Sequence, residues 1–264
     1  MAHNSAVMNV MIKAARQAAR GLQRDFGEVE ALQVSRKGAA DFVSAADTRA
    51  EQVIFEELSR ARPKYGFIME ERGEIDGADN SNRWVVDPLD GTTNFLHGLG
   101  HFAISIGLER DRQPYAGVIY NPVSDDLFYA EKGEGAYLND RRIRVSARTD
   151  MSECLFACGL PFKGLPGRAQ ALKETEAVLT ETAGVRRFGA ASLDLAYVAA
   201  GRYDAYWERG LNPWDVCAGI VLVREAGGVV TEIDGGPNPL SGKSILATNG
   251  ELPDAAQKIL LVSA

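Results

Sequence analysis

Residues 87–95, Asp-Pro-Leu-Asp-Gly-Thr-Thr-Asn-Phe, constrain this chain more than any other part of its sequence. Two carboxylates stand three residues apart, and a glycine and two threonines follow at once. Hard divalent cations such as Mg²⁺ take oxygen ligands and keep positions open for water and phosphate, so this segment suits them better than histidines or thiols would. The β-prone residues 83–86 precede it, which predicts that the carboxylates lie at a Pro-initiated turn where a buried strand ends. A helix that opened at Thr92 would turn its free N–H groups toward a bound phosphate.

Taken singly, these residue types are ordinary turn and helix-cap residues. As a whole, residues 87–95 resemble the signature of the inositol monophosphatase family of Mg²⁺-dependent, lithium-sensitive phosphatases. A second segment, residues 212–219 (Asn-Pro-Trp-Asp-Val-Cys-Ala-Gly), is similar to the C-terminal signature of the same family. Pro213 fits the first turn of a helix, where Asp215 could serve only to complement the helix dipole. The resemblance instead implies that Asp215 is a metal ligand.

Three further segments, residues 37–47, 67–71 and 187–208, also resemble the family, so that the resemblance extends over roughly residues 10–260. Without the resemblance each segment has an ordinary structural interpretation. Residues 48–51 read as a capping box ahead of a helix, which would make Asp47 a helix-entry residue. The other acids in these segments read as surface groups of a turn and of a strand end: Glu70, Glu71 and Glu208.

The resemblance implies a role for each matching residue. The implied metal ligands, for two or three Mg²⁺ ions, are Glu70, Asp87, Asp90, Asp215 and the carbonyl oxygen of Leu89. The implied catalytic residues are Glu70, Thr92 and Asp47, because the family uses an Asp–Thr pair and a metal-bound glutamate to orient the attacking water. The implied substrate-binding residues are Gly91, Thr92, Gly189, Ala190, Ala191, Glu208 and Asp215. Lys37 is implied to influence the charge of the site, and Glu71 to lie behind the ligands.

The activity implied by the resemblance is hydrolysis of inositol 1-phosphate to inositol and phosphate by a metal-activated water, with no covalent phosphoenzyme and with inhibition by Li⁺. Other enzymes built on this metal framework leave alternatives open, namely fructose 1,6-bisphosphate, histidinol phosphate, NADP and nucleotide 3′-phosphates as substrates. Some bacterial relatives also contact the transcription apparatus, so a regulatory binding role is a further alternative. Relatives in the family are usually homodimers.

Composition narrows the class of protein. The 264 residues are 45% hydrophobic and 25% charged, which is typical of a folded globular enzyme. A net charge of −7 argues against a broad nucleic-acid-binding face, although residues 141–144 form a short basic strip. Three cysteines favour free thiols in a reducing compartment, and we expect a cytoplasmic protein. The sequence contains no run of 18 apolar residues, so it predicts no membrane span. Apolar residues recur at helical spacing within residues 7–22, which predicts a core-packing helix rather than a transit peptide.

The order of predicted elements indicates a mixed fold. Two helices precede a meander of strands near residues 84–86, 102–109, 115–120, 127–131 and 136–138. Helices then alternate with strands after about residue 150, near residues 168–182, 192–201, 213–226 and 252–261. We therefore expect an α+β half (residues 1–146) with most of the metal ligands and an α/β half (residues 147–264) with Asp215 and the substrate pocket. The resemblance implies that both halves pack as one unit, the layered αβαβα sandwich of the inositol monophosphatase and fructose-1,6-bisphosphatase type.

Overall fold

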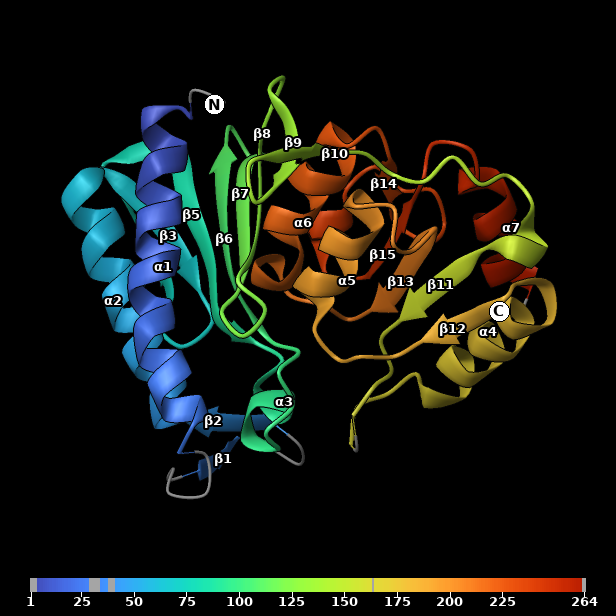
Figure 1. Cartoon of the computed structure of the whole chain (residues 1–264), viewed down its shortest axis with the longest axis horizontal. Coiled ribbons are helices and arrows are strands. Elements are labelled where there is room, and N and C mark those ends of the chain that lie inside the picture. Colours follow the sequence, from blue (N-terminus) through green and yellow to red (C-terminus); the bar gives the residue numbers. More distant parts are fainter. Residues whose placement is uncertain (1–3, 29–33, 38–40, 163, 263–264) are drawn as a thin grey trace.

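The structure is a computed structural model that describes residues 4–28, 34–37, 41–162 and 164–262, and it describes no side chain of residues 34–44. Five layers lie side by side in Figure 1: two helices, a large sheet, two helices, a smaller sheet and two further helices. The layered αβαβα sandwich expected from the sequence is confirmed. The short hairpin of β1 (Val34–Lys37) and β2 (Asp41–Ser44) lies beneath this stack, beside α3 (Thr92–Leu96).

The first layer contains α1 (Ala6–Phe26) and α2 (Ala45–Ala61). The Ser5 hydroxyl starts α1 by accepting the N–H of Met8 at 3.1 Å, which satisfies one donor of the first helical turn. The buried side chains of α1 recur at helical spacing, as predicted, and pack with those of α2 against the large sheet. The predicted capping box is wrong, because α2 already begins at Ala45 and so takes Asp47 into its first turn.

The large sheet has the strand order β10-β9-β8-β7-β6-β5-β3-β4. Only the β3–β5 pair is parallel among its described strands, and the others form the antiparallel meander that the sequence predicted. The strands are β3 (Tyr65–Met69), β4 (Gly73–Ile75), β5 (Asp79–Asp90), β6 (Ala103–Arg110), β7 (Gln113–Asn121), β8 (Asp126–Glu131), β9 (Gly135–Leu138) and β10 (Arg141–Ile143).

Strand β5 differs from its predicted form. It continues to Asp90 instead of turning at Pro88, and Asp87 pairs with Ser105 whereas Asp90 pairs with Ala103. Three steps along β5 thus oppose two along β6, which is a β-bulge of one extra residue. Residues three apart on a regular strand point to opposite faces, so the extra residue lets both carboxylates face the same side. Pro88 is tolerated because a bulge interrupts the hydrogen-bond ladder.

The second sheet has the order β12-β11-β13-β15-β14 and lies entirely after residue 146. Its strands are β11 (Leu155–Cys158), β12 (Gly184–Arg186), β13 (Ala205–Arg209), β14 (Val229–Thr231) and β15 (Ser244–Thr248). The helices of this half are α4 (Arg168–Glu181), α5 (Ala191–Ala199), α6 (Pro213–Glu225) and α7 (Pro253–Val262), close to the predicted ranges.

Three hydrophobic clusters fill the spaces between the five layers. The first joins α1 and α2 to the large sheet, and the third joins the second sheet to α4 and α7. The middle cluster combines large-sheet residues such as Ile119 and Phe128 with α5, α6 and the second sheet. Gly117 and Gly107 lie so close to α6 that a Cβ on either would meet Ala218 or Cys217 at less than 3 Å. Residues from both halves therefore contribute to one hydrophobic core.

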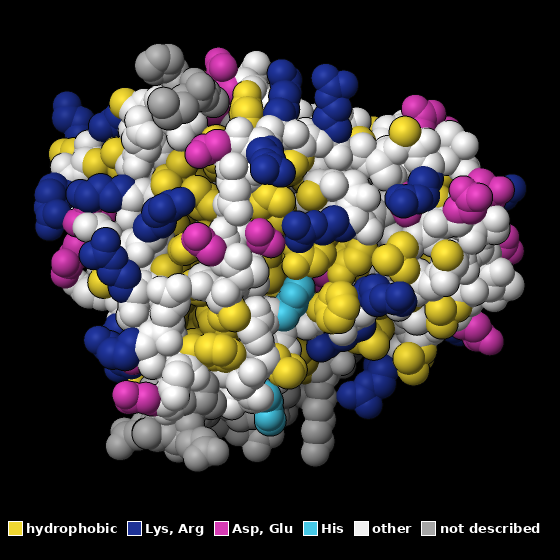
Figure 2. All heavy atoms as spheres, viewed as in Figure 1, with side chains coloured by type: hydrophobic (Ala, Val, Ile, Leu, Met, Phe, Trp, Pro, Cys, Tyr) yellow, Lys and Arg dark blue, Asp and Glu magenta, His cyan; other side chains and the backbone are white. Residues whose placement is uncertain are grey.

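The surface carries no extended basic stripe on the face drawn in Figure 2, where Lys and Arg side chains are spread among acidic and polar ones. The three cysteines are buried and free. Among the residues that the structure describes, no helix combines the length and the apolar character needed to cross a bilayer.

Candidate active site

The parallel pairing of β3 with β5 brings the first acids together. Because parallel strands end at the same edge of a sheet, Glu70, which follows β3, lies beside the end of β5, where Asp87 and Asp90 stand. The N–H of Glu70 donates to the carbonyl oxygen of Val86 at 3.2 Å and fixes this position. The Asp87 carboxylate in turn accepts the N–H of Leu89 at 2.9 Å, which closes the bulge on itself.

The predicted acids form one electrostatic cluster. Burial raises the pKa of Asp87 well above its usual range, and repulsion from four other carboxylates raises it further. Those carboxylates belong to Glu70, Asp90, Asp215 and Asp47. Oxygens of Asp47, Glu70 and Glu71 lie within 4.8 Å of one another. Glu71, which the sequence placed behind the ligands, is thus near enough to take part in cation binding.

The buried Glu51 of α2 holds the Glu70–Glu71 segment in place. Its carboxylate accepts the N–H of Glu71 at 2.8 Å and pairs with Arg72 at 3.2 Å. Burial raises the pKa of Glu51, while these partners lower it. From the sequence Glu51 was assigned only to a capping box. The signal of its real position is its helical spacing to the buried Ile54 and Leu58, which places an acid on the apolar face of α2.

Asp90 links the cluster to the start of α5. Its Oδ2 accepts the N–H of Ser192 at 2.7 Å and also the Ser192 hydroxyl. The N-cap residue of α5, Ala190, has no side-chain acceptor, so Asp90 caps this helix from the opposite half of the molecule. Burial raises the pKa of Asp90 to about 6, although the hydrogen bonds from Ser192 and Ala191 lower it. The role of Ser192 was not predicted from the sequence, since a serine in the first turn of a helix is common.

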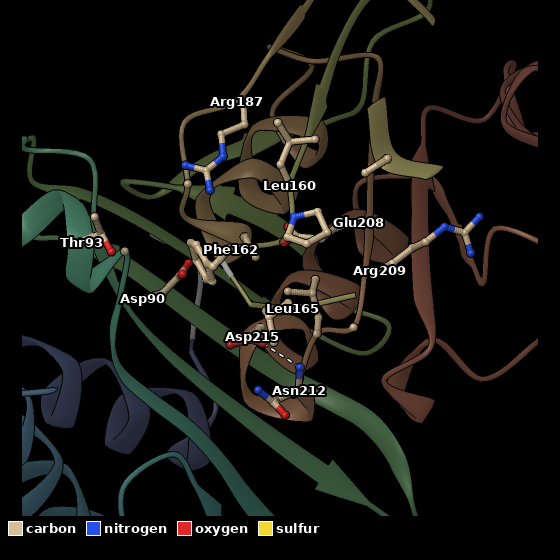
Figure 3. A pocket seen from close by; sticks show the side chains of 18 of the residues that line it. Asp90, Thr93, Leu160, Phe162, Leu165, Arg187, Glu208, Arg209, Asn212 and Asp215 are labelled. Carbon is tan, nitrogen blue, oxygen red and sulfur yellow. Dashed lines mark hydrogen bonds between the residues drawn. The ribbon is translucent and has the colours of Figure 1, made fainter. Parts of the chain in front are cut away.

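Asp215 reaches the same cluster from α6. It lies in the first turn, after Pro213, and its carboxylate accepts the N–H of Asn212 at 2.7 Å, as Figure 3 shows. Desolvation and then repulsion from Asp90 raise the pKa of Asp215 well above its usual range. Capping the helix and joining the acidic cluster are therefore compatible roles for one carboxylate.

Gly91 and Thr92 connect the cluster to the short helix α3. Gly91 has a φ of 90°, and a Cβ there would meet the carbonyl oxygen of His101 at 3.0 Å, so only glycine fits without strain. The Thr92 hydroxyl donates to the Leu89 carbonyl oxygen at 2.9 Å. This acceptor differs from Asp47, to which the sequence analysis assigned the threonine proton.

A cavity of about 600 Å³ opens beside the acids, between the two halves. Most of the predicted site residues line it: Glu70, Asp87, Leu89, Asp90, Gly91, Thr92, Gly189, Ala191, Glu208 and Asp215. Asp47 and Ala190 are buried and do not line it, and the side chain of Lys37 is outside the described part of the structure. The loop between β11 and α4 adds an apolar wall that the sequence analysis missed: Leu160, Pro161, Phe162, Leu165 and Pro166.

Glu208 lies on β13 and lines the cavity (Figure 3), close enough to Asp90 for the two carboxylates to repel each other. The Tyr206 hydroxyl donates to its Oε2, which leaves Oε1 available to a ligand. Desolvation raises the pKa of Glu208 to about 7. A Cβ on Gly159 would lie 1.8 Å from this carboxyl carbon, so the glycine makes room for Glu208. The role of Gly159 was not predicted from the sequence.

Comparison with known proteins gives one consistent result. The sequence pattern of the inositol monophosphatase family matches residues 3–262. The chain belongs to the inositol monophosphatase family. Its curated relatives include an "Inositol-1-monophosphatase" of Caulobacter vibrioides, 58% identical over 92% of this chain and 96% of that protein. They also include the "Nus factor SuhB" of Escherichia coli, 42% identical over 92% of this chain and 91% of that protein.

A solved structure of the same family supports the fold. The extragenic suppressor protein suhB of Bartonella henselae superposes with a TM-score of 0.94, at 56% identity, over 97% of this chain and 98% of that chain. Membership of this phosphatase family explains why so many carboxylates share one cavity end. Buried acids that raise one another's pKa destabilise the folded state unless a cation or protons neutralise them.

The donor set fits a hard divalent cation. Every candidate ligand in the cluster is a carboxylate or carbonyl oxygen, and none of the three cysteines or the described histidines lines this cavity. The carboxylates come from β5, from the end of β3, and from α2 and α6, so the tertiary fold and not one local turn creates the site. A divalent cation held there could neutralise a phosphate group, and the cavity beyond it has room for the alcohol part of an ester.

Proposed function

We propose that this protein is a Mg²⁺-dependent phosphatase that hydrolyses inositol 1-phosphate to inositol and phosphate. The observation that carries the proposal is that four carboxylates, from Glu70, Asp87, Asp90 and Asp215, line one cavity. A hydrogen-bond acceptor, Glu208, faces the same cavity. The four carboxylates thus favour a cation and phosphate, and Glu208 favours a polyol.

The residues that would hold Mg²⁺ are Glu70, Asp87, Asp90, Asp215 and the carbonyl oxygen of Leu89. When bound, the metal neutralises phosphate charge, lowers the pKa of water and stabilises the leaving oxygen. The Leu89 carbonyl oxygen accepts the Thr92 hydroxyl, and its second lone pair could bind the metal at the same time. For the expected Asp47–Thr92 pair to orient the attacking water, the Thr92 hydroxyl would have to rotate from Leu89 toward Asp47.

The phosphate would be held by the N–H groups of Gly91 and Thr92 at the start of α3. The left-handed conformation of Gly91 turns the chain sharply there and leaves no side chain between the backbone and the cavity. Gly189 and Ala191 also line the cavity, close to Gly91. Ala190 packs behind the cavity wall against Gly91, so its contribution is to shape that wall.

Glu208 is proposed to accept hydrogen bonds from substrate hydroxyls through the oxygen that Tyr206 leaves available. Glu208→Ala is expected to raise KM for polyol phosphates more than it lowers Mg²⁺ affinity. Kinetics with inositol 1-phosphate and calorimetry with Mg²⁺ measure the two effects separately. An unchanged substrate profile would remove Glu208 from the pocket.

The test of the function is phosphate release from inositol 1-phosphate, fructose 1,6-bisphosphate, histidinol phosphate, NADP and 3′-phosphoadenosine 5′-phosphate, each with and without Mg²⁺ and Li⁺. Preferential, Mg²⁺-dependent and Li⁺-sensitive turnover of inositol phosphate is expected. Preference for another ester would replace the substrate but keep the reaction, and no turnover of any ester by a sample that binds Mg²⁺ would overturn the proposal.

A second role as a partner of the transcription apparatus is favoured by one observation, the 42% identity to a relative that is named a Nus factor. Binding to transcription proteins in a pull-down, by wild-type protein and by Asp90→Asn alike, would support it. If substitutions of surface residues abolish this binding and Asp90→Asn does not, the binding role is separate from catalysis.

A homodimer in the cytoplasm completes the proposal. Large apolar side chains exposed on the described surface, among them Phe162, Leu165 and Phe188, are the kind that a subunit interface covers. Light scattering of the purified protein would measure the oligomeric state, and fractionation of its source cells would measure the location.

A further inference from the structure

Asp194 is a buried acid that the proposed reaction does not use. It lies in the first turn of α5, is only 1% exposed, and does not line the cavity. Its Oδ1 has no hydrogen-bond partner among the residues that the structure describes. A buried polar group without a partner destabilises the folded state, and an apolar side chain of similar size would remove that penalty. An acid at this position therefore calls for a role that a leucine could not fill.

The groups around Asp194 are two buried tyrosines and Glu208. Helix α5 packs against β13 (Figure 1), where Tyr206 and Glu208 are two positions apart and so point to the same face of the strand. Burial raises the pKa of Tyr203 and Tyr206, and repulsion from an ionised Asp194 would raise both further. Such repulsion is strong only over short distances, so these four side chains lie near one another. Only Glu208 among them lines the cavity.

The Asp194 side chain is a carboxylic acid near neutral pH. Burial raises its pKa well above the usual range, and the charges of Glu208 and Asp90 raise it further. The charge of Arg187 acts in the opposite direction. A protonated carboxyl group carries one O–H donor, and a buried donor needs an acceptor. The Tyr206 oxygen can be that acceptor, because it has lone pairs besides the proton that it donates to Oε2 of Glu208.

We propose that Asp194 and Tyr206 are positioning residues, which form a hydrogen-bonded chain behind the cavity wall and hold Glu208 with its Oε1 toward the substrate. This rests on the proposed function, since it takes Glu208 as the group that accepts hydrogen bonds from substrate hydroxyls. The Asp194 carboxyl group donates to the Tyr206 oxygen, which in turn donates to Oε2 of Glu208. Each bond polarises the next, so that a fixed acceptor faces the polyol. The chain thereby favours alcohols that carry hydroxyl groups over alcohols that carry none.

The first test compares an ester with ring hydroxyls, inositol 1-phosphate, with an ester that has none, 4-nitrophenyl phosphate, both at saturating Mg²⁺. Tyr206→Phe removes the bond that orients Glu208. It is expected to raise KM for the inositol ester about tenfold, and at least about five times more than KM for the nitrophenyl ester, with a smaller effect on kcat. Tyr203→Phe is the matched control, because Tyr203 is a buried tyrosine whose hydroxyl has no partner among the described residues. Equal effects of the two substitutions would overturn the proposal.

The role of Asp194 is tested by stability and kinetics together. Asp194→Leu removes a buried acid, so it is expected to unfold at a higher urea concentration than wild type and yet to raise KM for inositol 1-phosphate about threefold or more. Asp194→Asn keeps a donor for the Tyr206 oxygen, so its KM should stay within about twofold of wild type. A purely structural Asp194 predicts the opposite, a loss of stability in both variants with KM unchanged, and that result would overturn its role.

A third measurement needs no turnover. The infrared difference spectrum of wild type minus Asp194→Asn near pH 7 should contain the C=O stretch of a carboxylic acid, and a carboxylate band in its place would overturn the chain. Calorimetry with myo-inositol should show weaker binding to Tyr206→Phe than to wild type. If wild type cleaves neither ester while both of these results are obtained, the proposed function fails and the positioning chain stands.

Discussion

Asp90→Asn should make the metal-free protein more stable while it removes most of the activity. The variant keeps an amide oxygen that can accept the Ser192 N–H and hydroxyl, so the cap of α5 survives. It removes one negative charge from a buried cluster whose members repel each other. A neutral amide cannot replace a carboxylate as a cation ligand, so Mg²⁺-dependent turnover should fall by orders of magnitude.

The size of the stability change follows from the pKa of Asp90. Burial moves this pKa from 3.8 to about 6 in a residue that is only 9% exposed. A shift of roughly two units corresponds to about 3 kcal/mol, since each unit is worth about 1.4 kcal/mol. Because the folded-state pKa of this acid is raised, its ionisation disfavours the folded state; that penalty grows as pH rises from about 3.8 to about 6 and is fully present above about 6. Without metal, Asp90→Asn should be more stable than wild type by about 3 kcal/mol near pH 8 and by only about 1 kcal/mol near pH 4.5.

Urea unfolding in EDTA, followed by the fluorescence of the buried Trp84 and Trp207, measures this difference. Adding Mg²⁺ should stabilise wild type more than the variant, because only wild type keeps the full ligand set. Glu176→Gln, an exposed acid of α4, is the control and should leave both the pH dependence and the Mg²⁺ response unchanged. A metal-free Asp90→Asn protein that is no more stable than wild type near pH 8 would refute the reasoning.

Three further substitutions test the parts of the site that the sequence did not reveal. Gly159→Ala should displace the Glu208 carboxylate, whose carbon would lie 1.8 Å from the new Cβ, and should raise KM for polyol phosphates while calorimetry finds Mg²⁺ affinity unchanged. Glu51→Ala should weaken Mg²⁺ binding about tenfold, because the Glu71 N–H loses its acceptor, whereas Glu51→Gln keeps an acceptor and should bind nearly as wild type. Ser192→Ala should raise the pKa of Asp90 above about 6, because a hydrogen bond to the carboxylate is lost. Titration of the metal-free protein followed by NMR measures this pKa, and an unchanged value would contradict the prediction.

Much of the fold follows from local patterns. The helices of the second half and the antiparallel meander were predicted within a few residues, because periodicity and turn residues act over short distances. The course of β5 was not, since Asp-Pro normally indicates a turn and only the pairing of Asp87 and Asp90 with β6 shows that the strand continues through a bulge. The start of α2 was predicted too late for a similar reason, because Thr48 resembles a helix cap although the helix begins at Ala45.

The residues of the candidate site also fall into those that the sequence predicted and those that it did not. The sequence motifs indicated the acids themselves, and the structure brings Asp47, Glu70, Asp87, Asp90 and Asp215 together. The residues that position those acids could not be predicted from the sequence, since each contacts a partner far away in the chain. Ser192 bonds to a carboxylate 102 positions earlier, and Gly159 matters only because β13 places Glu208 beside it. No local pattern encodes such contacts.

The bond between Asp90 and α5 also acts on the charge of the cluster. Burial raises the pKa of Asp87, Asp90 and Asp215, whereas the N–H groups at the start of α5 and the Ser192 hydroxyl lower that of Asp90, because they favour its charged form. The cap that joins the two halves of the molecule therefore offsets part of the cost of burying a carboxylate beside other carboxylates. One contact thus serves the packing of the two halves and the ionisation of a proposed metal ligand.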